Sequence, residues 1–135
     1  QQARSMVLEK TQMGQAVAFC DAAGGPEKLT AKVVGDAADQ GDPLAQAILA
    51  TSGAYLGQGL AILLDLLNPE RIIIGSIFAR SRRWIWPAAD EIMKRESLAR
   101  TYRRCQVVPA QLGEQIGDLA ALCIAVEGEK GSFAK

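Results

Sequence analysis

The stretch Leu67–Phe78, "LNPERIIIGSIF", predicts a helix end, a strand and a glycine loop in close succession. A helix ends at Asn68-Pro69, because proline cannot continue it. Ile72–Ile74 form a strand that is apolar on both faces, which is typical of a strand inside a sheet covered by helices. Ligands of open α/β sheets usually sit at the C-terminal ends of such strands. Gly75 and Ser76, which follow the strand, are therefore the candidate binding residues.

Upstream of this stretch the chain is predicted to be helical. Residues 6–22 form one helix that stops before Gly24-Gly25-Pro26. Thr30 offers its hydroxyl as an N-cap for a short helix over residues 31–40. Asp42-Pro43 then starts a long helix that runs to Leu67, since aspartate caps and proline fits the first helical position.

The long helix carries Gly53, Gly57 and Gly59, each of which weakens it by up to ~1 kcal/mol relative to alanine. Such a helix persists only if tertiary packing compensates. We expect another backbone to approach closely along the glycine-bearing side, because a missing Cβ lets elements pack nearer.

Downstream, Pro87 is expected early in a helix that reaches about Leu98, followed by a strand over Cys105–Val108. A last helix starts near Glu114 and is followed by a polar tail. The apolar positions of this helix follow helical spacing and are expected to face the core; they are Ile116, Leu119, Ala120, Cys123 and Val126.

Two strands separated by a helix predict a right-handed βαβ unit in an α/β fold. Two strands do not make an independent sheet of normal size. We therefore expect the sheet to be completed by polypeptide outside these 135 residues, in agreement with the missing initiator Met.

Composition narrows the functional classes. The chain has 15 Lys and Arg against 15 Asp and Glu, so its formal net charge is zero and nucleic-acid binding is not expected. Three scattered cysteines and no histidine predict neither a zinc site nor a disulfide framework, and any catalysis would rest on carboxylates. The thiols are expected to be reduced, in a cytoplasmic protein.

The uncharged run of residues 44–64 is long enough to span a bilayer. Its polar residues and its acidic flanks, Asp42 and Asp65, favour a buried core helix instead. The start of the chain has no apolar signal segment. We therefore expect no membrane association.

Residues 41–75 and 107–125 resemble the C-terminal half of the ROK family, bacterial sugar kinases and sugar-responsive repressors of the actin/hexokinase-like (ribonuclease H-like) ATPase fold. The resemblance covers Leu29 to Val126. It rests on four elements in this order and spacing, which are Gly41-Asp42-Pro43-Leu44-Ala45, Tyr55-Leu56-Gly57, Leu67-Asn68-Pro69-Glu70, and Leu112-Gly113-Glu114 with Gly117.

The resemblance implies a helix-rich C-terminal lobe with an incomplete sheet, on the nucleotide side of a two-lobed protein. It implies three segments, namely an N-terminal helix and linker (1–28), the lobe (29–127) and a tail (128–135). Gly75 and Ser76 would approach the adenosine of ATP, although Ser76 replaces one glycine of the family pattern. A tight turn without any ligand is the alternative.

The family's phosphate loop, catalytic aspartate, sugar-binding Glu-His pair and cysteine-rich zinc site have no counterpart in this chain. The resemblance thus implies no catalytic residue and no metal ligand here; ATP with Mg²⁺ would bind the whole protein. The implied partners are the N-terminal lobe, the nucleotide and further copies of the protein.

The cluster of arginine and tryptophan residues between positions 80 and 86 has two interpretations. Arg80, Arg82 and Arg83 beside Trp84 and Trp86 could bind phosphate or nucleic acid, but a subunit or lobe contact fits such aromatic and arginine residues better.

The carboxylates Glu114 and Asp118 are expected to complement the dipole of the last helix rather than to form a catalytic pair.

Three functions remain open at this point. The first is the lobe of a sugar kinase, which by itself transfers no phosphate. The second is the same lobe of a sugar-responsive repressor, and the third is a self-association module without chemistry.

Overall fold

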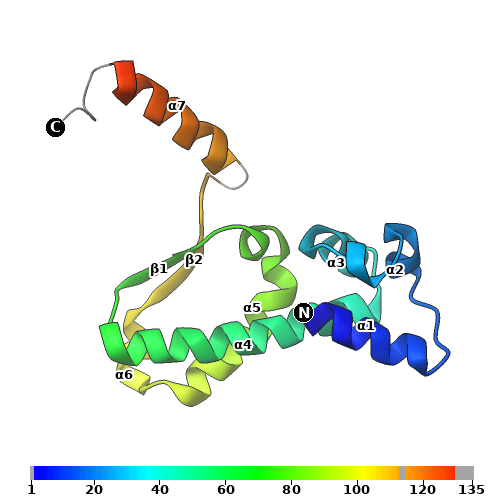
Figure 1. The fold of residues 1–135 in the computed structure, drawn as a ribbon. Helices are drawn as coiled ribbons and strands as arrows, with labels where there is room; N and C mark the ends of the chain where they lie inside the picture. Colours follow the sequence, from blue (N-terminus) through cyan, green and yellow to red (C-terminus); the bar gives the residue numbers. More distant parts are fainter. Residues whose placement is uncertain (1, 113–114, 130–135) are drawn as a thin grey trace.

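The computed structural model describes residues 2–112 and 115–129 and shows a helix-rich α/β arrangement (Figure 1). The described elements, in chain order, are α1 (Gln2–Gln12), α2 (Ala18–Ala23), the 3-10 turn η1 (Pro26–Lys28), α3 (Ala31–Asp39), α4 (Pro43–Leu67), β1 (Arg71–Ile74), α5 (Ile77–Glu96), α6 (Ala99–Arg104), β2 (Gln106–Pro109) and α7 (Ile116–Glu129).

The long helix α4 has the bounds that its cap residues predict. Asp42 Oδ1 accepts a hydrogen bond from the Ala45 N–H at 2.9 Å, and Pro43 occupies the first turn. At the other end Asn68 adopts the left-handed conformation (φ 44°, ψ 51°) and donates its N–H to the Leu64 carbonyl. Thr30 likewise caps α3 through the Val33 N–H, as predicted.

The most extensive helix contact in the chain joins α4 to α5 through two glycines. A Cβ on Gly53 would overlap the carbonyl oxygen of Ile85. A Cβ on Gly57 would lie 2.5 Å from the carbonyl oxygen of Ala89. The predicted close approach of a second backbone is confirmed at these two positions. It is wrong at Gly59, where a Cβ would meet nothing within 4 Å.

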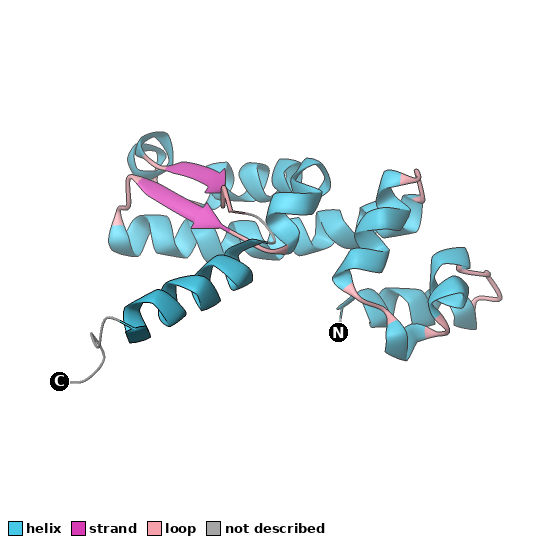
Figure 2. Cartoon of the chain, turned by 90° about the horizontal axis from the view of Figure 1, so that it is seen from above, coloured by secondary structure: helices cyan, strands magenta, loops and turns pink. Residues whose placement is uncertain are grey.

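The two strands form a parallel pair, with Arg71 opposite Gln106 and Ile74 opposite Pro109 (Figure 2). Helix α5 connects them, so the predicted βαβ unit is confirmed. The expectation that the first strand is buried on both faces is wrong within this chain, because Ile73 is 65% exposed. Only one face of the pair packs on helices, through Ile72 and Ile74.

The predicted single helix over residues 6–22 is two helices. Gly14 takes a left-handed backbone (φ 76°) and donates its N–H to the Thr11 carbonyl, which ends α1. The second helix, α2, stops at Gly24 as predicted, in the left-handed conformation.

The expectation that Pro87 lies early in its helix is wrong. Helix α5 begins at Ile77, so Pro87 lies well inside it. Pro87 is on the exposed side. The backbone departs from helical geometry at Ser81 (φ −106°, ψ 23°), which separates a first turn from the rest of the helix. The helix ends at Glu96, before Leu98.

The last helix, α7, projects away from the other elements in both views (Figures 1 and 2). All of its described side chains, residues 117–126, are exposed. The expected inward packing of Leu119, Ala120, Cys123 and Val126 is therefore wrong in this chain; the side chain of Ile116 lies outside the described residues. The apolar spacing of α7 does not correspond to a buried face within the described chain.

Among the helices of the described ranges, α4 alone is long and apolar enough to cross a membrane by length and composition. In the most apolar 18-residue stretch of α4, 39% is buried inside the structure.

We predict that Gly53→Ala destabilises the chain by about 2 kcal/mol or more, because the α4 and α5 backbones must separate to admit a methyl group. The matched control is Gly59→Ala, which should raise the free energy of unfolding by up to ~1 kcal/mol. Urea unfolding at low protein concentration measures both. Equal stability of the two variants would contradict the close approach.

Candidate functional site

The loop Gly75-Ser76 lies at the C-terminal edge of the two-stranded sheet. The Ala110 N–H donates to the Ile74 carbonyl at 2.9 Å, which holds the end of β2 beside the end of β1. Helix α5 starts directly after Ser76. The loop is thus positioned by both strands and by the helix that packs on α4.

Ser76 has a backbone conformation that normally belongs to glycine. Its φ of 55° and ψ of −134° match the first central position of a type II′ turn, which glycine dominates. A non-glycine residue in such a region costs on the order of 1–3 kcal/mol. The Ser76 side chain is exposed and makes no capping hydrogen bond to α5, so the side chain does not offset this strain.

Gly75, in contrast, has an ordinary φ and ordinary surroundings. A Cβ at Gly75 would lie 3.8 Å from the Cβ of Ala110, a normal van der Waals distance. Neither the backbone nor the packing of the described chain requires glycine at this position.

The first turn of α5, which follows the loop, is held by buried side chains. Phe78 is buried and meets Trp86 edge-on, with ring centroids 6.0 Å apart. Ser81 is buried where the helix departs from regular geometry. Gly35 of α3 makes room for it, since a Cβ there would lie 2.8 Å from the Ser81 Oγ.

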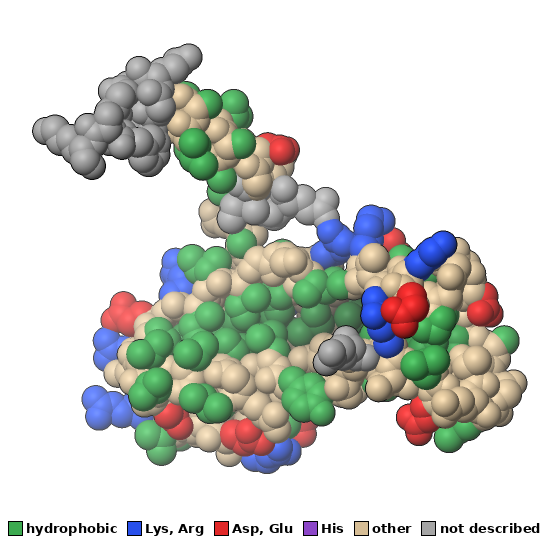
Figure 3. All heavy atoms as spheres, in the orientation of Figure 1, with side chains coloured by type: hydrophobic (Ala, Val, Ile, Leu, Met, Phe, Trp, Pro, Cys, Tyr) green, Lys and Arg blue, Asp and Glu red, His purple; other side chains and the backbone are tan. Residues whose placement is uncertain are grey.

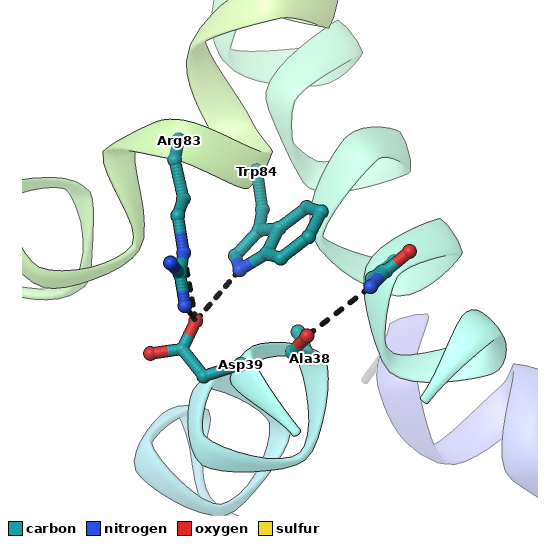
Figure 4. A network of polar contacts seen from close by, with 5 residues as sticks. Ala38, Asp39, Arg83 and Trp84 are labelled. Atoms are coloured by element: carbon teal, nitrogen blue, oxygen red, sulfur yellow. Dashed lines mark hydrogen bonds and ion pairs between the residues drawn. The ribbon is translucent and has the colours of Figure 1, made fainter. Parts of the chain in front are cut away.

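Asp39 at the end of α3 holds the next turn of α5 (Figure 4). Its Oδ1 accepts hydrogen bonds from Trp84 Nε1 at 2.7 Å and from Arg83 Nε at 3.0 Å. The Trp84 hydrogen bond, followed by the Arg83 hydrogen bond, lowers the pKa of the Asp39 carboxyl. The Arg83 guanidinium also lies 5.1 Å from the centre of the Trp84 ring. These contacts fix α3 against α5.

A cavity of about 480 Å³ opens between α1, α3, α4 and α5. Its walls are mostly apolar, with Val34, Ile48 and Ile85 among them, and Arg4 and Thr30 add polar groups. Ile77, the residue after Ser76, forms part of its wall. The cavity and the loop therefore share one structural element.

The described residues offer little further chemistry. No three His, Cys, Asp or Glu side chains among them lie close enough together to hold a metal ion. Burial raises the pKa of Cys20, with a smaller contribution from Asp21, and burial also raises the pKa of Cys105. Asp118 lies in the first turn of α7, where an acid complements the helix dipole. Glu114, the other acid singled out in the sequence, lies outside the described residues.

A comparison with models of protein families identifies the family of the chain. The model of the ROK family matches residues 6–127. The chain belongs to the ROK family. The resemblance noted in the sequence is confirmed, and it extends upstream into α1.

Two relatives of this ROK chain are regulators from Escherichia coli K12. The chain is 30% identical over 89 residues to the DNA-binding transcriptional repressor Mlc, which covers 66% of the chain and 22% of Mlc. It is 29% identical over 86 residues to the DNA-binding transcriptional dual regulator NagC, and this match covers 64% of the chain and 21% of NagC. The chain thus spans about a fifth of the length of these relatives.

Two solved structures are similar to the chain, one of a regulator and one of a putative sugar kinase. A ROK family transcriptional regulator, a homolog of E. coli Mlc, superposes with a TM-score of 0.68 at 27% identity, covering 79% of this chain and 26% of that one. A putative sugar kinase from Cytophaga hutchinsonii superposes with a TM-score of 0.61 at 25% identity, and the match covers 73% of this chain and 33% of the kinase chain.

Gly75 and Ser76 are consecutive residues at the end of β1, directly before α5. Arg83 and Trp84, for which the sequence favoured a subunit or lobe contact, contact Asp39 within this chain. Asp39 was missed, because an acid at the end of a short helix carries no local signal of a partner 44 residues away.

We predict that Ser76→Gly raises the free energy of unfolding by about 1 kcal/mol, because glycine adopts this backbone without strain. The control, Ser76→Ala, should give no such gain, since alanine also has a Cβ. Chemical unfolding of both variants measures the effect. A loss of stability on Ser76→Gly would show that the serine side chain itself stabilises the loop.

Proposed function

We propose that this chain is part of the C-terminal, nucleotide-side lobe of a ROK-type sugar kinase with the actin/hexokinase-like fold. The full-length protein would phosphorylate a hexose with ATP and Mg²⁺ in the cytoplasm. One observation carries the proposal, the glycine-type backbone of Ser76 at the C-terminal edge of the sheet. Backbone strain that the serine side chain does not offset points to a functional reason for the conformation.

The nucleotide would contact Gly75 and Ser76 through their backbone. Gly75 fits this role because nothing within the described chain requires glycine there, whereas a flat base or ribose approaches a residue without Cβ more closely. ATP would supply the phosphoryl group. The described residues contain no acidic cluster for Mg²⁺, so the ion would be held by the phosphates and by residues of the other lobe.

The chain by itself is expected to transfer no phosphate. Phosphoryl transfer requires a positioned nucleophile, a metal ion and charge stabilisation in one place. The sequence has no histidine, and several of its described carboxylates have structural roles: Asp42 caps α4, Asp39 binds Arg83 and Trp84, and Glu70 pairs with Arg104. The N-terminal lobe is therefore the first partner this chain requires, and the outward face of β1 and the exposed α7 are surfaces it could cover.

The second candidate is the same lobe of a sugar-responsive repressor. A specific observation favours it, namely that both regulators described above match the chain and that the regulator structure superposes with the higher TM-score. A serine in place of glycine in the loop also fits a lobe that has no need for nucleotide. DNA contacts would then come from outside this chain, whose formal net charge is zero.

Calorimetric titration of ADP into the full-length protein, with a hexose phosphorylation assay, separates these functions. If the proposal holds, ADP binds, and Ser76→Glu weakens binding by at least about tenfold because the longer side chain would fill the space that the base or ribose takes. The matched control is Gln106→Glu, which places the same charge at the opposite edge of the sheet and should leave ADP affinity unchanged.

A full-length protein that binds a hexose but gives no heat with roughly millimolar ADP would contradict the kinase and support the repressor.

A further inference from the structure

The first two turns of α5 lie between the loop and the close contact with α4. The glycines of α4 meet the α5 backbone at Ile85 and Ala89. Upstream of these residues the α5 backbone departs from helical geometry at Ser81. Because this break interrupts the regular helix, the position of Ser76 depends on the contacts that hold residues 77–84.

Helix α3 contacts this stretch where it begins. A Cβ at Gly35 would lie 2.8 Å from the Ser81 Oγ and 3.9 Å from the Ile77 Cδ1. Gly35 therefore lets α3 reach both the break and the first residue of α5. Helix α3 is itself held on α4, because Gln46 Nε2 donates a hydrogen bond to the Ala38 carbonyl at 3.2 Å.

Asp39 extends this contact by one turn. It lies four residues after Gly35, on the same face of α3. Its Oδ1 accepts hydrogen bonds from Trp84 Nε1 at 2.7 Å and from Arg83 Nε at 3.0 Å (Figure 4). Hydrogen bonds to an ionised carboxylate are roughly twice as strong as those between neutral groups. Asp39 therefore holds the two residues that precede Ile85, where the contact with α4 begins.

An ion pair as such is not unusual in this part of the molecule. Positive and negative side chains lie side by side at the end formed by α1, α2 and α3 (Figure 3), and Lys32 pairs with Asp36 within α3. Exposed pairs of this kind contribute little to stability. Asp39 differs because its partners lie 44 and 45 residues away on another helix, and because one donor is a half-buried, neutral indole.

We propose that Asp39 is a positioning residue for the nucleotide loop. Its carboxylate holds the second turn of α5 while Gly35 lets α3 reach the first, and together these contacts keep Ser76 where the nucleotide would meet it. This role rests on the nucleotide binding proposed above. It adds that nucleotide affinity depends on a carboxylate whose described hydrogen bonds go to the second turn of α5.

Calorimetric titration of ADP into the full-length protein measures the effect. We expect Asp39→Ala to raise the ADP dissociation constant at least about threefold, because the released turn lets the loop take other positions. Asp39→Asn should retain part of the affinity, since an amide oxygen still accepts the Trp84 hydrogen bond. The matched control is Asp36→Ala, which removes an exposed pair within α3 and should leave the affinity unchanged.

Native-state hydrogen exchange of the same variants needs no nucleotide. In Asp39→Ala the amides of residues 77–84 should exchange at least about threefold faster, while those of α4 keep their wild-type rates. Asp36→Ala should change neither set. Unchanged exchange of residues 77–84 would overturn the proposal, because α3 would then not hold this stretch. Circular dichroism checks folding, and Asp39→Asn carries the same comparison if Asp39→Ala does not fold.

The two readouts distinguish a failure of this inference from a failure of the proposed function. If wild-type protein binds ADP and Asp39→Ala binds it equally well, Asp39 has a structural role only and the positioning role is wrong. Equal weakening by Asp39→Ala and Asp36→Ala would also overturn it. Wild-type protein that gives no heat with roughly millimolar ADP would contradict nucleotide binding and the positioning role together, whereas faster exchange of residues 77–84 in Asp39→Ala would still show that α3 holds them.

Discussion

The close approach of α4 and α5 is the constraint on which the rest of the structure depends. Gly53 and Gly57 bring the carbonyls of Ile85 and Ala89 against the α4 backbone. This contact fixes the axis of α5, and the first turn of α5 in turn positions Ser76 at the sheet edge. Asp39 adds a second tie, from α3 to Arg83 and Trp84. The loop is therefore held by helix packing, with only two strands to support it.

Features with a local cause were predictable from sequence. Asp42 and Pro43 start α4 and Asn68 ends it, because capping and proline chemistry act within a few residues. The strand before Gly75 was likewise predictable from its apolar run and its breakers. The close approach at Gly53 was predictable as well, since a glycine inside a long helix needs a packing partner.

Features that depend on distant residues were not predictable. The spacing of apolar residues in α7 indicates a buried face, but it does not say whether the covering surface belongs to this chain. Ser76 looked like a substitution that weakens a glycine loop, whereas the backbone retains the glycine conformation with a serine in place. The same glycine argument failed at Gly59, where a Cβ would meet nothing within 4 Å in the described chain.

Native-state amide hydrogen exchange tests the central constraint most directly. If the α4–α5 contact holds the fold together, the amides around Gly53–Gly57 and Ile85–Ala89 exchange slowest and only through global unfolding, while those of α7 exchange fastest. Equal or greater protection in α1, α2 or α7 would contradict this account, because it would place the most stable part of the molecule away from the glycine-mediated contact.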